Sequence, residues 1–207
     1  MHRILPFLAL LALIAAGAPA HAADLDVPAA LADRILGNPD APITITEFSS
    51  LTCPHCADFH AETMPKIKAE WIDTGKARLI ISEFPLDGVA LRAAALSRCV
   101  APERFYPIVD VLFKTQAQWE RAADPVKALS QTGKLAGLDQ AHIDACVANK
   151  ALTDGILQKR MLAEKQYKVE STPTFVFSGP NGGSDTLVGA EPYDAFDKVL
   201  TALYAKK

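Results

Sequence analysis

The sequence from Ile43 to Cys56 reads ITITEFSSLTCPHC, and this stretch decides the fold. Its first six residues are rich in β-branched side chains, which is typical of a strand. The polar run that follows reads as a loop, and Pro54 suits the first position of a helix, where its missing N–H costs nothing. The stretch therefore predicts a strand, a short loop and a helix that starts within a Cys-x-x-Cys motif.

The neighbouring residues extend this stretch into a βαβ unit. We expect one helix from about Pro54 to Asp73, kinked at Pro65, and a second strand from Ala77 to Phe84. Strands joined by such a crossover are parallel. The lead-in before Ile43 is short and has a weak helical stretch near Ala29–Leu36.

The rest of the chain is helical and then returns to strands. Residues 88–167 show helical periodicity and no good strand. Residues 173–177 and 186–188 are strand-like and flank a turn rich in Gly and Asn, and a last helix is expected from about Pro192 to Tyr204. The order βαβ, helices, ββα predicts an α/β fold, a four-stranded mixed sheet with a helical insertion between its two halves.

Composition and charge narrow the function classes. The chain has 207 residues, of which 50% are hydrophobic and 22% charged, so we expect one packed domain, or one domain with a large insertion. The formal net charge is -3 and no Lys/Arg-rich run occurs, so a nucleic-acid partner is not expected.

The N-terminus has the pattern of a targeting segment. His2 and Arg3 precede an apolar run from Ile4 to Ala16, and Ala20-His21-Ala22 offers small residues for cleavage. We interpret residues 1–22 as a cleaved signal peptide; a membrane anchor is the alternative, although the run is short for one. Export places the four cysteines in an oxidising compartment, where disulfides persist.

The pair Cys53 and Cys56 carries the chemistry. Unpaired N–H groups and the dipole at a helix start stabilise a thiolate on Cys53, and His55 can add to this. A lower thiol pKa favours the reduced form, so the disulfide becomes a stronger oxidant. The alternative is half of a zinc site, but the remaining cysteines, Cys99 and Cys146, are isolated from each other in helical sequence.

These features together resemble the DsbA-type family of the thioredoxin superfamily. The resemblance rests on the strand, the motif Cys53-Pro54-His55-Cys56, the kinked helix, the helical insertion and Thr172-Pro173 before a strand. It implies a thioredoxin fold with an inserted helical domain, divided into residues 23–87, 88–150 (the insertion) and 151–207. It also implies Cys53 as the nucleophile, Cys56 as the resolving thiol, and no cofactor or metal.

The resemblance assigns roles to further residues. Pro173 should be cis and lie against the disulfide, leaving the backbone of Thr172 free to pair with an extended substrate. Glu47 should lie under the disulfide and relay protons to Cys56, although no lysine accompanies it near residues 79–84.

Several further assignments concern the core. We expect a structural disulfide between Cys99 and Cys146, since each is on an apolar stripe and some relatives carry a second disulfide in this region; two buried thiols are the alternative. Residues that could line a substrate groove, but that are more typical of a core or rim, are Phe59, His60, Met64 and Phe84.

The expected function is donation of a disulfide to unfolded exported proteins with free thiols, in the periplasm. As the family implies, a membrane quinone-linked oxidase of the DsbB type would re-oxidise the enzyme, which we expect to be a monomer. One alternative is a disulfide isomerase or reductase, favoured by Thr172 before Pro173. Another is a periplasmic protein that binds copper through Cys53, His55 and Cys56.

Overall fold

The strand that begins at Ile43 is the middle strand of a five-stranded sheet. The structure is a computed structural model that describes residues 25–206, so the predicted signal peptide, residues 1–22, lies outside the described residues. The sheet order is β1-β3-β2-β4-β5. The strands are β1 (Ile35–Leu36), β2 (Ile43–Ser49), β3 (Ala77–Glu83), β4 (Thr174–Ser178) and β5 (Ser184–Val188).

The strand directions follow from the connections. β2 and β3 are parallel, as the βαβ prediction requires, and both β2–β4 and β4–β5 are antiparallel. β2 therefore has a hydrogen-bonded strand on each side. The loop after Ser49 accordingly leaves the sheet from its central strand.

The prediction of four strands was wrong at the N-terminus. The stretch expected to be helical near Ala29–Leu36 divides into helix α1 (Val27–Leu31), capped by the Asp26 side chain, and strand β1. β1 pairs antiparallel with β3, Ile35 opposite Ile80. Two residues are too few to show the alternating pattern of a strand. β1 is recognised only by its pairing with the edge of β3.

The active-site helix is broken near the predicted kink. Instead of one helix there are α2 (Pro54–Glu62), α3 (Met64–Ile67) and a π-helical turn (Lys68–Ile72). The break is at Thr63, because Pro65 lacks an N–H and its ring crowds the preceding turn.

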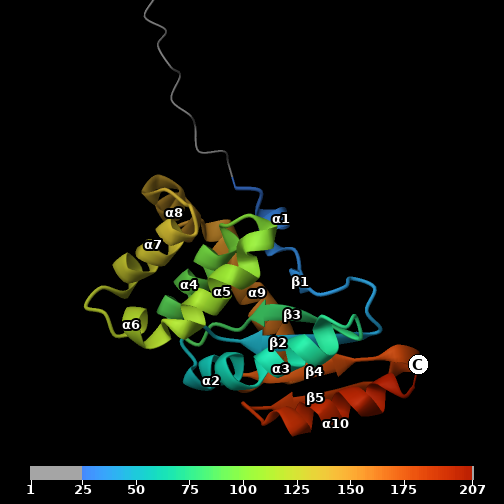
Figure 1. Cartoon of the computed structure of the whole chain (residues 1–207). Helices are drawn as coiled ribbons and strands as arrows, with labels where there is room; N and C mark the ends of the chain where they lie inside the picture. The colour runs from blue at the N-terminus through green and yellow to red at the C-terminus, as the bar shows by residue number, and fades with distance from the viewer. Residues whose placement is uncertain (1–24, 207) are drawn as a thin grey trace, which may run out of the picture.

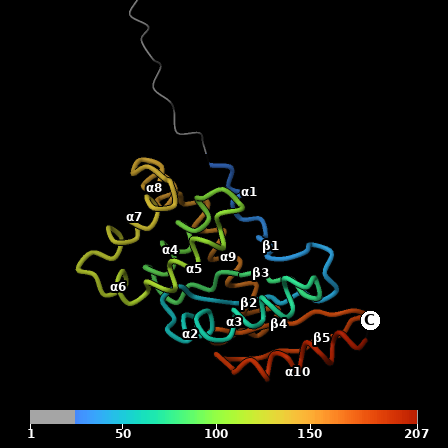
Figure 2. Tube along the Cα trace, viewed as in Figure 1, coloured from blue at the N-terminus to red at the C-terminus, as the bar shows by residue number. Residues whose placement is uncertain are grey.

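Seven α-helices of different lengths follow β3 in the described residues. Those of the insertion gather at one side of the molecule, at left in Figure 1, and the tube in Figure 2 shows the chain entering and leaving them. The helices are α4 (Gly88–Arg98), α5 (Phe105–Lys114), α6 (Gln116–Glu120), α7 (Pro125–Leu135), α8 (Gln140–Val147), α9 (Lys150–Tyr167) and α10 (Tyr193–Tyr204), with 3-10 turns at Pro102–Arg104 and Pro180–Gly182.

Helices cover both faces of the sheet. Helices α2, α3 and α10 pack on one face, where the main core includes Ile45, Phe59, Phe175 and Phe196. Helix α9 packs on the other face, where Ala163 belongs to a smaller core cluster. In Figure 1, α10 lies below the sheet and α9 behind it. Among residues 25–206, no helix has the length and apolar character needed to cross a bilayer.

A buried ion pair ties the insertion to the sheet. Arg98 at the end of α4 donates to both carboxylate oxygens of Glu83 on β3, and both side chains are buried. The same guanidinium donates to the Ala32 carbonyl at 2.7 Å and lies over the Phe105 ring at 4.6 Å. Because a buried charge is costly unless it is paired and hydrogen-bonded, this network holds α4, β3 and the N-terminal segment in one arrangement.

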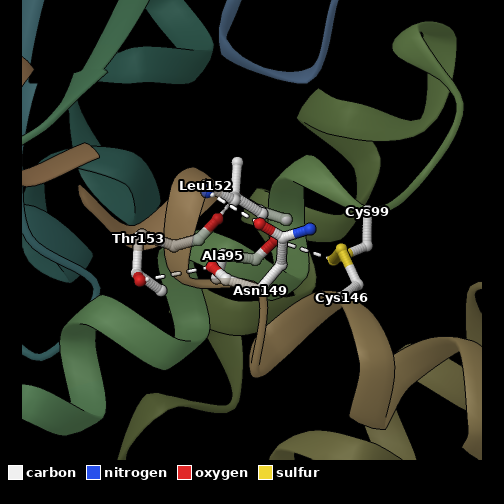
Figure 3. The surroundings of a disulfide bond; sticks show 8 residues. Ala95, Cys99, Cys146, Asn149, Leu152 and Thr153 are labelled. Carbon is white, nitrogen blue, oxygen red and sulfur yellow. Dashed lines mark hydrogen bonds between the residues drawn. A yellow bond between two sulfur atoms is a disulfide. The ribbon is translucent and has the colours of Figure 1, made fainter. Parts of the chain in front are cut away.

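A disulfide joins two helices of the insertion. Cys99 at the end of α4 is bonded to Cys146 of α8, with a Cα–Cα distance of 6.0 Å. Figure 3 shows the bond beside Asn149, whose side chain accepts from the Leu152 N–H at 3.0 Å and so caps α9. The bond therefore fixes α8 against α4 just where the chain turns into α9.

Replacing both Cys99 and Cys146 with alanine should lower the free energy of unfolding by about 4 kcal/mol, because the bond closes a long loop in the unfolded chain. Urea unfolding of the oxidised protein measures this. Either single substitution alone should cost nearly as much as the double substitution, since each already breaks the bond. Independent, additive costs would show that lost packing, and not the bond, is responsible.

Candidate active site

The two motif cysteines lie at the start of α2, directly after the central strand. Cys53 is the N-cap residue and Pro54 the first residue of the helix. The Cys53 N–H donates to the Ser50 carbonyl at 3.0 Å, which closes the turn between strand and helix. Both thiols are free, Cys53 is mostly buried, and Cys56 is completely inaccessible at 0% exposure. The strand–loop–helix arrangement thus places the more accessible sulfur of Cys53 beside the inaccessible sulfur of Cys56.

Hydrogen bonds at the helix start make Cys53 acidic. The pKa of Cys53 is lowered to about 5, chiefly by a hydrogen bond from the Cys56 thiol and further by the Thr172 side chain and the backbone N–H groups of Cys56 and His55. Burial opposes this shift but does not outweigh it. At neutral pH, Cys53 is therefore a thiolate, the form that attacks disulfides.

The opposite holds for Cys56. Burial raises its pKa far above the ordinary value, the interaction with Cys53 raises it further, and so does the negative charge of Glu47. The Ser49 side chain lowers it only in part. At neutral pH, Cys56 is therefore a protonated thiol.

The loop before β4 completes the site. The Thr172–Pro173 peptide bond is cis. Cys53 Sγ lies 3.3 Å from the Thr172 carbonyl oxygen, across 119 residues of sequence. Within residues 25–206, no backbone carbonyl accepts the Thr172 N–H, and the buried Thr172 hydroxyl has no hydrogen-bond partner.

His55 contributes through its backbone. Its N–H lowers the pKa of Cys53, whereas its side chain is 72% exposed and its Nδ1 lies 3.7 Å from the Asp58 carboxylate. Stabilisation of the thiolate by the imidazole stays a prediction. No group of three or more His, Cys, Asp or Glu side chains suited to a metal ion occurs in the described part of the chain.

Glu47 is fully buried, as its place on the Ile43 and Ile45 face of β2 predicted. Both of its carboxylate oxygens lie within 3.1 Å of His60 Nε2. From the sequence, His60 is more typical of a core or rim residue. The only signal for it was its position seven residues after Cys53, two helical turns along the same face of α2.

The insertion holds the active-site loop at two points. The Gln116 side chain, from α6, donates to the carbonyls of Leu51 and Cys53 at 2.8 and 3.0 Å. Thr52 Oγ1 donates to Asp87, the residue that caps α4, at 2.7 Å. Sequence analysis missed Gln116, because a lone glutamine in a helix carries no signal of a partner 63 residues away.

Comparisons with known proteins agree with this arrangement. A family model described as Thioredoxin matches residues 30–195. The crystal structure of Wolbachia pipientis alpha-DsbA1 is 33% identical, with a TM-score of 0.77 over 84% of this chain and 92% of that chain. A protein-disulfide isomerase from Novosphingobium aromaticivorans is 25% identical, with a TM-score of 0.70 over 83% of this chain and 97% of that chain.

A protein of Rickettsia bellii named "Putative protein-disulfide oxidoreductase" is 30% identical over 71% of this chain. The match covers 57% of that protein, so the chain spans little more than half the length of the curated relatives it matches first. On these findings the chain belongs to the DsbA-type family of thiol–disulfide oxidoreductases, within the thioredoxin superfamily. The predicted thioredoxin fold with inserted helices is confirmed.

The lowered pKa of Cys53 predicts a pH-dependent gain in stability on reduction. In the unfolded chain this thiol has an ordinary pKa near 9, and in the folded reduced protein about 5. The contribution is therefore absent below about pH 5, grows as pH rises, and is complete only above pH 9. The unfolding midpoint of the reduced protein should rise relative to that of the oxidised protein between pH 4 and pH 8.

Thiolate absorbance in the same pH range assigns the effect to Cys53. The titration should have its midpoint at about 5 in the wild type and disappear in C53A. A midpoint near 9, with no change in relative stability, would contradict the hydrogen-bonded thiolate.

Replacing Gln116 with leucine should destabilise the protein by about 2 kcal/mol, because the buried Leu51 carbonyl loses its side-chain donor and the Cys53 carbonyl loses one of its three donors. Chemical unfolding of the oxidised protein measures this. Gln118 is exposed on the same helix, so Q118L is the matched control and should change little. Equal effects of the two substitutions would show that helix propensity, and not the loop contact, is responsible.

Proposed function

We propose that this protein is an exported oxidase that donates the Cys53–Cys56 disulfide to unfolded proteins with free thiols in the periplasm. The observation that carries the proposal is the asymmetry of the two thiols, since the pKa of Cys53 is lowered to about 5 and that of Cys56 is strongly raised. A stabilised thiolate makes the reduced enzyme the favoured product, so its disulfide is readily given away.

The reaction proceeds in two exchanges. A substrate thiolate attacks Cys53 Sγ, the Cys53–Cys56 bond breaks, and Cys56 leaves and takes up a proton. A second substrate thiolate then attacks the substrate sulfur of the mixed disulfide and releases the Cys53 thiolate. The substrate gains a disulfide and loses two electrons, and the enzyme is reduced to one thiolate and one thiol. A membrane quinone-linked oxidase of the DsbB type would restore the disulfide.

The cis Thr172–Pro173 loop supports a sequence-tolerant substrate site. Within residues 25–206 the Thr172 N–H has no backbone partner and Thr172 lies beside Cys53, so an extended substrate segment can pair there with main chain alone. Such pairing suits many substrates, because every non-proline residue offers the same backbone groups.

Export is supported by the sequence of residues 1–22 and by the second disulfide. A structural bond such as Cys99–Cys146 is typical of proteins in an oxidising compartment. The isomerase alternative is favoured by Thr172 and by the similarity to the protein-disulfide isomerase from Novosphingobium aromaticivorans. The copper alternative requires the His55 ring to join both cysteines, but the ring lies beside Asp58.

The wild-type mature protein should be a monomer that oxidises reduced ribonuclease quickly and rescues scrambled ribonuclease slowly, because one site on one chain does not hold a misfolded substrate through repeated exchange. Sedimentation and the two refolding assays measure this. C53A should lose both activities, and C56A should accumulate a mixed disulfide at Cys53.

A stable oligomer with strong activity on scrambled ribonuclease would contradict the oxidase proposal and favour an isomerase. Stoichiometric copper binding without thiol oxidation would contradict both.

A further inference from the structure

The buried carboxyl group of Glu47 contacts the side chain of His60. The roles assigned to the Cys-x-x-Cys motif do not account for this contact. His60 Nε2 lies 3.0 and 3.1 Å from its two oxygens, and these are the hydrogen bonds that reach this carboxylate among the described residues. The Glu47 side chain is 0% exposed and that of His60 is 8% exposed. Among the described residues, His60 is therefore the side chain that offers Glu47 a hydrogen-bonded route toward the surface.

The His60 ring is held in one orientation by aromatic neighbours. It stacks on Phe113 of α5, with ring centroids 4.3 Å apart and planes at 23°. Phe59 contacts it edge-on, with centroids 5.3 Å apart and planes at 90°. A ring fixed between α2 and α5 keeps its Nε2 on Glu47 without needing a further hydrogen bond.

His60 also lines a groove of about 410 Å³ between α2–α3 and α5. The other polar side chains of this groove are Lys68, Tyr106 and Asp110. Neither Cys53 nor Cys56 is among the residues that line this groove. The negative charge of Glu47 acts on Cys56, and His60 lies between the Glu47 carboxyl group and the groove.

Tyr106 is the other titratable group in the groove that feels the charge of Glu47. Its hydroxyl lies 2.7 Å from the carbonyl oxygens of both Arg34 and Leu79, and burial raises its pKa. It therefore stays neutral and engaged with backbone oxygens. Lys68 pairs with Asp73 at 2.6 Å, so it too has a partner.

We propose that His60 is a positioning residue that carries protons between Glu47 and the groove and so controls the chemistry of Cys56. When a substrate thiolate breaks the Cys53–Cys56 bond, the Cys56 thiolate takes a proton through the Glu47 carboxyl group, and groove water replaces it through the imidazole. When Cys56 attacks a mixed disulfide at Cys53, its thiol proton leaves along the same path. One sulfur–sulfur bond forms, one breaks, and the proton ends in water.

This inference rests on the proposed thiol–disulfide exchange, and it concerns the gain and the loss of the Cys56 proton within it. Nothing that lowers the pKa of Cys53 involves His60. Loss of the imidazole should therefore slow reactions of Cys56 and leave those of Cys53 unchanged.

The test follows reduced protein after mixing with oxidised glutathione, by acid quenching and mass spectrometry. The first step forms a mixed disulfide at Cys53, and the second releases glutathione by attack of Cys56. H60Q keeps a donor for Glu47 but cannot take up and release a proton. It should form the mixed disulfide at the wild-type rate and resolve it about tenfold more slowly. His142 lies on α8, so H142Q is the matched control and should behave as the wild type.

Chemical rescue separates proton transfer from packing. H60A opens a ring-sized space onto the groove, and imidazole in solution should restore fast resolution. Pyrazole has the same size but is a much weaker base, so it should not.

A wild-type rate of resolution in H60Q, or equal rescue by both heterocycles, or rescue by neither, would overturn the relay. Absence of any mixed disulfide at Cys53 in the wild type would instead contradict the proposed function, and the relay with it.

Discussion

The site depends on the unequal surroundings of two sulfur atoms that lie one helical turn apart. Cys53 sits where helix α2 offers unpaired N–H groups, and Cys56 sits one turn further in, where it is completely buried. The same hydrogen bond between them lowers the pKa of Cys53 and raises that of Cys56. The central strand β2 sets this arrangement, because it has a hydrogen-bonded strand on each side and delivers the loop to the core.

The helical insertion is part of the site and not only a cover for it. Gln116 and Asp87 hold the loop that ends in Cys53, and Phe113 holds the His60 ring. The Arg98–Glu83 pair and the Cys99–Cys146 bond in turn fix the insertion to the sheet and to itself. Support of this kind holds the reacting sulfur and its hydrogen-bond donors in place.

The sequence was sufficient for the parts of the fold that local patterns define. The βαβ unit, the break near Pro65 and the burial of Glu47 follow from side-chain periodicity and from proline, which act within a few residues. Strand β1 and Gln116 could not be predicted this way, because their partners are far along the chain. His60 is an intermediate case: its helix face was readable, but its contact with Glu47 depends on how α2 packs on β2.

The two sulfurs also differ in what their surroundings are made of. The Cys53 thiolate is stabilised first by the Cys56 thiol, and further by the Thr172 side chain and by the backbone N–H groups of Cys56 and His55. The environment of Cys56 is built from specific side chains, namely Ser49 and Glu47, with His60 behind them. Backbone groups tolerate substitution, whereas a carboxyl group and an imidazole do not. Changes within the same fold should therefore alter proton exchange at Cys56 before they alter the nucleophilicity of Cys53.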